Sequence, residues 1–202
     1  MLRLAAVTAT LVGLSMPALA QFSGDYAPGK WITSHLPNPS TDGGSVDTSL
    51  APVSITLIGS NTTPFDPAFS ALEFKIVALA GGTFSFDWSY KTNDIGYPGT
   101  PGDPTDPPVP PPFFDPAFVI RNGQILLTDN AGLPTQSGSF SVVVVKDDVI
   151  GFRIDSFDNY GGNATLTISN FMAPIPEPAS VAMMSLGLLG VAVAAARRRR
   201  SN

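Results

Sequence analysis

Between residues 21 and 173 the sequence alternates apolar and polar side chains over short runs, and no stretch of 11 residues there repeats at helical spacing. The run 83–90 is the clearest, because its aromatic residues all fall at even positions and so on one face of a strand. Such runs, separated by turn residues, predict an all-β domain, a two-sheet β-sandwich of the jelly-roll kind. The predicted strands are 53–58, 72–78, 83–90, 117–121, 124–128, 139–145, 149–155 and 164–171.

Two turns between these runs carry a sequence signal. Asn122-Gly123 stands between two apolar runs and predicts a β-hairpin with a type I′ turn. Lys146-Asp147-Asp148 stands between two further apolar runs and predicts a second hairpin.

One segment interrupts the strand pattern. From 98 to 116, nine of nineteen residues are Pro, which predicts a long loop that is partly polyproline II. A docking peptide and the rim of a binding site are two functional interpretations. We favour a surface insertion in the domain 21–173, because the flanking strands can pair without this loop.

The N-terminus is typical of a secretory signal peptide, residues 1–20. Arg3 precedes an apolar run over 4–14, and Ala18-Leu19-Ala20 forms a small-residue cleavage site. The run is interrupted by Thr and Gly and is too short to span a bilayer. We therefore predict cleavage by signal peptidase after Ala20.

The C-terminus holds a second apolar segment. Residues 179–196 contain no charge, and Arg197, Arg198, Arg199 and Arg200 follow at once. As a helix, the segment would reach roughly 27 Å, enough for a thin hydrocarbon core. The arginines predict a transmembrane helix with its C-terminus in the cytoplasm and the preceding chain outside.

Three alternating prolines precede this apolar segment. Pro174, Pro176 and Pro178 prevent residues 174–178 from forming a helix or pairing in a central strand, so we expect an extended, accessible tether. The Pro176-Glu177-Pro178 triplet, the glycine-bearing apolar helix and the arginine tail together resemble a PEP-CTERM sorting domain, also known as the ice-binding protein C-terminal domain. The resemblance covers residues 174–200 and departs only at Ile175, where Val is commoner.

This resemblance implies a sorting route and no catalytic activity. Tails of this kind are thought to be recognised at the Pro-Glu-Pro triplet by a membrane-embedded exosortase, in bacteria that make exopolysaccharide. The implied processing residues here are Pro176, Glu177, Pro178 and the four arginines. We therefore expect an inner-membrane intermediate, followed by release or transfer to the cell surface or extracellular matrix.

Composition excludes several chemistries for the passenger domain, residues 21–173. Its six basic and fifteen acidic residues give a net charge of −9, which argues against a nucleic-acid partner. The chain has no Cys and one His, so cysteine catalysis and multi-histidine metal sites are excluded. His35 lies in a Pro/Ser-rich region, and we expect it at a surface or an edge. The chain has no G-x-S-x-G motif, and most acids of the domain fall in turns. We expect no enzymatic activity; a carboxylate-dependent hydrolase is the weaker alternative.

An adhesin that binds a glycan or calcium is the other alternative. Asp155, Asp158 and Asn159 cluster at a strand end, and oxygen ligands of this kind suit a structural Ca²⁺; otherwise we expect no cofactor. Trp31 and Tyr97 are the aromatic residues that we expect at the surface, where they could contact an exopolysaccharide. The sequence thus predicts where the protein goes more closely than what it binds.

Overall fold

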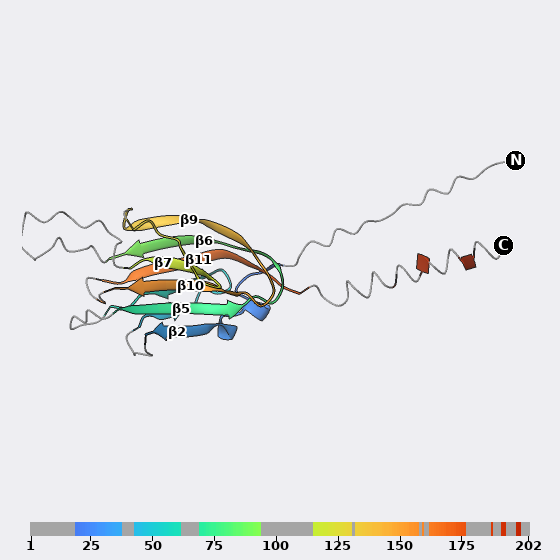
Figure 1. Cartoon of the computed structure of the whole chain (residues 1–202), viewed down its shortest axis with the longest axis horizontal. Helices are drawn as coiled ribbons and strands as arrows, with labels where there is room; N and C mark the ends of the chain where they lie inside the picture. Colours follow the sequence, from blue (N-terminus) through green and yellow to red (C-terminus); the bar gives the residue numbers. More distant parts are fainter. Residues whose placement is uncertain are drawn as a thin grey trace, which may run out of the picture.

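A computed structural model describes residues 19–37, 43–61, 69–93, 115–130, 132–157, 159, 162–176, 187, 191–192 and 197–198. Within these residues the strands form two antiparallel sheets, which confirms the predicted all-β, two-sheet architecture. Figure 1 shows β9, β6 and β11 together and, beside them, β10, β5 and β2. Residues 1–18 of the predicted signal peptide lie outside the described residues. The same is true of the predicted transmembrane segment 179–196, apart from residues 187, 191 and 192. No helix among the described residues is both long enough and apolar enough to cross a membrane.

The β6 sheet has the strand order β3-β4-β11-β6-β9, and a short β1 also pairs with β11. The β10 sheet has the order β2-β5-β10-β7-β8. The bounds for the β6 sheet are β1 Leu19–Ala20, β3 Ser45–Asp47, β4 Ser54–Ile58, β6 Gly82–Thr92, β9 Thr135–Val144 and β11 Ala164–Pro174. Those for the β10 sheet are β2 Ile32–Leu36, β5 Ser70–Val77, β7 Ala117–Arg121, β8 Gln124–Leu126 and β10 Val149–Ser156.

The core lies between the sheets and follows the predicted alternation. Phe84, Phe86 and Tyr90 of β6 are buried, and they meet Phe152 and Ile154 of β10 in one hydrophobic cluster. Burying a side chain of this size contributes about 1.5–3 kcal/mol. The even-numbered face of β6 is therefore the core face, and its odd-numbered residues form the outer surface of that sheet.

The first predicted hairpin is confirmed, but its turn type is not I′. Strands β7 and β8 pair with Ile120 opposite Gln124, which leaves a three-residue turn. Asn122 has φ 51°, whereas Gly123 lies outside the left-handed region that a type I′ turn requires at both central residues.

The second predicted hairpin is wrong, because β9 pairs with β6 in one sheet and β10 pairs with β5 and β7 in the other. The Lys146–Asp148 turn therefore carries the chain between sheets. Asp148 holds this crossover by accepting hydrogen bonds from the Val145 N–H and from Asn122 Nδ2.

The proline-rich segment also connects the two sheets. Strand β6 ends at Thr92 in one sheet and β7 begins at Ala117 in the other. The flanking strands do pair without this loop, β6 with β11 and β9, and β7 with β10 and β8, but in different sheets. Residues 98–114 of the loop lie outside the described residues.

Candidate functional site

Strand β11 ends at Pro174, the first of the three alternating prolines, and this residue is still packed in the sandwich. Ala173 and Pro174 are buried, and Ile175 packs against the core. Pro176, the next residue, is exposed. The folded domain therefore gives way to accessible chain within two residues, directly before Glu177.

A segment from the start of the domain holds the end of β11 in place. The ring of Phe22 is buried and stacks on Phe171 of β11, with ring centroids 4.3 Å apart. Tyr26, in the 3-10 turn η1 (Gly24–Tyr26), is fully buried and meets Phe171 edge-on at 5.8 Å. We call residues 22–31 the N-terminal clasp.

The hydroxyl of Tyr26 joins the clasp to two other parts of the fold. It donates a hydrogen bond of 2.9 Å to the Pro174 carbonyl and accepts one of 3.0 Å from the Leu79 N–H. Burial raises the pKa of Tyr26, so the hydroxyl keeps the proton that it donates. Sequence reasoning missed this residue because Tyr26 belongs to no alternating run.

The predicted processing residues fall at and beyond this end of the sandwich. Ala20 is in β1 and pairs with Ala173 of β11. The predicted signal-peptide cleavage site therefore lies beside the strand that leads into the Pro-Glu-Pro triplet. Arg197 and Arg198 are helical and exposed. Glu177, Pro178, Arg199 and Arg200 lie outside the described residues.

Trp31 is not a surface residue, contrary to expectation. Its side chain is 7% exposed, lies between Phe74 and Phe152 with near-parallel rings, and donates from Nε1 to the Tyr26 carbonyl. Trp31 lies outside every predicted strand, and exposure was expected for that reason, but the clasp folds this indole into the core. Tyr97, the other predicted surface aromatic, lies outside the described residues.

Two of the three predicted calcium ligands are engaged in other contacts. Asp155 is buried and hydrogen-bonded to Nε of Arg153, and Asn159 is buried and accepts a hydrogen bond of 2.5 Å from Ser70 Oγ. Asp158 lies outside the described residues. The described residues hold no group of three or more His, Asp or Glu able to bind a metal, and the calcium site stays a prediction.

Arg153 is the centre of a buried charge network on the outer face of the β10 sheet. Its guanidinium forms ion pairs with Asp155 through Nε and with Glu73 Oε1 through Nη1, the latter at 2.9 Å. Lys75 Nζ forms a further ion pair with Glu73 Oε2 at 2.6 Å. Burial would raise the pKa of Glu73, but hydrogen bonds from Lys75 and Arg153 lower it overall. For Asp155 burial prevails and its pKa is raised. Sequence reasoning did not anticipate this network.

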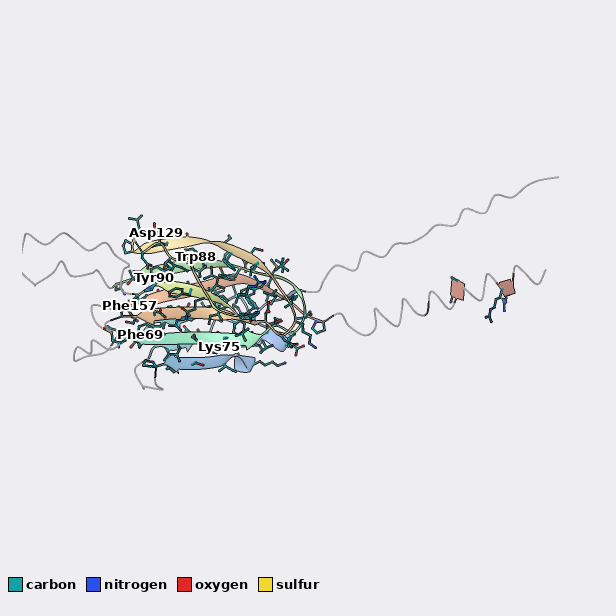
Figure 2. All side chains as sticks on the ribbon, viewed as in Figure 1. Phe69, Lys75, Trp88, Tyr90, Asp129 and Phe157 are labelled. Carbon is teal, nitrogen blue, oxygen red and sulfur yellow. The ribbon has the colours of Figure 1, made fainter. Side chains whose placement is uncertain are left out.

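The structure exposes an aromatic pair that the sequence pattern did not single out. Phe69 and Phe157 are 37% and 48% exposed, with ring centroids 5.6 Å apart, and Arg153 lies over the Phe69 ring. Figure 2 shows both rings at the same end of the sandwich, with Lys75 further along β5. His35, expected at a surface or an edge, is on the edge strand β2, and its Nδ1 lies 2.9 Å from the Gly43 carbonyl oxygen.

Comparison with solved structures returned carbohydrate-binding modules. A family 35 module from Clostridium thermocellum is 11% identical, with a TM-score of 0.32, over 76% of this chain and 98% of the module. A structure described as "CBM4 structure and function" is 11% identical, with a TM-score of 0.35, over 75% of this chain and 91% of its own. With scores this low, the likeness assigns neither a ligand nor an activity to this chain. A comparison with curated proteins found none that matches.

The C-terminal segment gave a family match. A family model described as the PEP-CTERM protein-sorting motif matches residues 174–200, the segment that contains the Pro-Glu-Pro triplet and the arginine tail. Its first two residues are the last that pack into the sandwich, and Pro176 is its first exposed residue. Residues 174–200 of this chain are therefore a PEP-CTERM protein-sorting motif.

Proposed function

We propose that this chain is the precursor of an exported, non-enzymatic protein of the cell surface or extracellular matrix, sorted by an exosortase-type enzyme. The observation that carries the proposal is the position of the PEP-CTERM motif. It begins where β11 leaves the core, and its Pro176 is exposed. A processing enzyme therefore meets accessible chain next to a folded domain.

The local chemistry of the motif supports this role. Pro174 is the last residue of β11 and pairs with Leu19, so the prediction that residues 174–178 avoid strand pairing is wrong at this position. Pro176 and Pro178 lack an N–H and have a fixed φ, so the chain beyond β11 resists helix formation and further strand pairing. An extended backbone is the conformation that a membrane-embedded processing enzyme can bind. The apolar segment 179–196 and the arginines that follow would hold the precursor in the inner membrane until it is processed.

The two ends of the domain support a single point of membrane attachment. Ala20 lies opposite Ala173, so the predicted signal-peptide and sorting segments join the sandwich at neighbouring positions. With both segments in the membrane, the sandwich would hang from it by this end. Removal of both segments would free the whole domain without breaking its core.

The test is Glu177→Ala in the full chain, expressed in a host that has the sorting enzyme. We expect a membrane-bound precursor that retains Arg197 to Arg200, detected by immunoblot against a C-terminal epitope. Glu177→Asp is the matched control for the carboxylate, and cleavage after Ala20 should be normal in both variants. Release of Glu177→Ala at the wild-type rate would refute the proposal.

A further inference from the structure

The outer face of the β6 sheet is rich in hydroxyl groups. Cross-strand pairing aligns Thr56, Thr167, Ser89 and Ser137 in one row across β4, β11, β6 and β9. The adjacent row is Ser54, Ser169, Asp87 and Ser139. Only one of these eight residues is charged, although the passenger domain carries a net charge of −9. Asp47 of β3 extends the first row, Lys91 lies one row further along β6, and Ser54 is buried, so the exposed hydroxyl groups lie between these charges and Asp87.

A β-bulge interrupts this face and adds one side chain to it. Ser169 pairs with Asp87 and Met172 pairs with Ser85, so β11 has one more residue than β6 between these two pairs. Asn170, the extra residue, has φ 48°, a left-handed conformation that Asn tolerates better than most residues. Bulges commonly redirect a side chain beside functional sites. Here the bulge brings Asn170 next to Asp87.

An open hollow of about 270 Å³ lies beside the bulge, and its polar groups face a common space. Asp87 accepts hydrogen bonds from Asn170 Nδ2 at 2.7 Å and from Ser139 Oγ at 2.5 Å. These bonds fix the carboxylate, and each oxygen keeps a second acceptor position. Ser85, Ser141 and Met172 also line the hollow, and Met172 is 39% exposed.

This combination matches the chemistry of a sugar ring. A carboxylate held by two donors can accept hydrogen bonds from ligand hydroxyls, serine hydroxyls can donate or accept, and a thioether side chain can contact the apolar C–H face. Hydrogen bonds to Asp87 lower its pKa, so the carboxylate is ionised at neutral pH. Its charge and that of the domain disfavour an acidic polymer.

We propose that the hollow formed by Ser85, Asp87, Ser139, Ser141, Asn170 and Met172 binds one sugar unit of a neutral polysaccharide, and that the hydroxyl rows bind neighbouring units. The site is on the outer face of the sheet and uses no residue of the sorting motif. Binding and sorting are therefore separable, and failure of one leaves the other intact.

The experiment is affinity electrophoresis of the mature protein in native gels. The gels contain a neutral polysaccharide (hydroxyethyl cellulose, xyloglucan, galactomannan or dextran) or the acidic polysaccharide alginate. We expect retardation by at least one neutral polymer and none by alginate. Asp87→Asn should weaken binding about tenfold, because hydrogen bonds to a charged carboxylate are stronger than those to a neutral amide. Retardation by no neutral polymer, or by alginate alone, would overturn the proposal.

Two further variants test whether the ligand lies in this hollow or on the opposite sheet. Ser141 is an exposed residue of the edge strand β9, so Ser141→Ala should weaken binding without altering thermal unfolding. This variant controls for misfolding of Asp87→Asn. Phe157→Ala alters the exposed aromatic pair on the other sheet and should leave binding unchanged. Loss of binding in Phe157→Ala, with wild-type binding in Asp87→Asn and Ser141→Ala, would place the ligand on the aromatic pair and refute the assignment.

Discussion

Tyr26→Phe tests the N-terminal clasp by removing one hydroxyl and keeping the ring. The hydroxyl pairs the Pro174 carbonyl, which is buried, and the Leu79 N–H, which is partly buried. Leaving a buried polar group unpaired costs about 1–3 kcal/mol, so the two groups together should cost about 3 kcal/mol. For a domain of this size, that loss corresponds to a fall in Tm of roughly 6–12 °C.

The assay is thermal unfolding of the purified protein, combined with amide hydrogen exchange. Exchange should accelerate at Leu79, whose N–H loses its acceptor. Lys30→Ala is the matched control in the same segment, because its ion pair with Asp25 is exposed and should contribute less than about 1 kcal/mol. An unchanged Tm together with unchanged protection at Leu79 would show that the hydroxyl does not hold β11.

Two further predictions concern charged groups in the sandwich. Arg153→Met leaves Glu73 and Asp155 without their shared buried partner, and we expect a loss of about 3–5 kcal/mol in denaturant unfolding; a loss below about 1 kcal/mol would contradict the network. The pKa of Asp148 is lowered by hydrogen bonds from Val145 and Asn122, so its stabilisation is complete above the unfolded pKa of about 3.9 and declines as the pH falls through the lower folded value. Asp148→Asn should therefore flatten the acid limb of stability against pH, and an unaltered limb would argue against this role.

Alternation predicted the strands that line the core, because a half-buried strand must place apolar residues at every second position. The predicted run 83–90 lies within β6, and the predicted run 164–171 lies within β11. Sheet assignment was harder to predict. Strands β9 and β10 are adjacent in sequence and joined by a short turn, yet they lie in different sheets. Both are apolar enough to pair, and the turn residues do not indicate which sheet each strand joins.

The clasp and the bulge illustrate what local pattern cannot reveal. Trp31 lies outside every predicted strand, and its burial depends on Phe74 and Phe152, which are distant in sequence. In strict alternation Asn170 would face the core with Leu166 and Ile168, and only pairing with β6 shows that it is the extra residue of a bulge and lies on the outer face. Such contacts arise from tertiary packing. In contrast, the sorting motif is a contiguous segment that sequence alone could identify, and the family match confirms it.

Intact mass spectrometry of the mature protein, recovered from the cell surface and the medium, would locate both predicted cleavage sites in one experiment. We predict a species that begins at Gln21, keeps the sandwich through Ile175 and lacks Arg197 to Arg200, because we propose that the sorting enzyme acts at the Pro-Glu-Pro triplet that follows the last packed residue. A mature protein that retains the arginine tail would contradict this account.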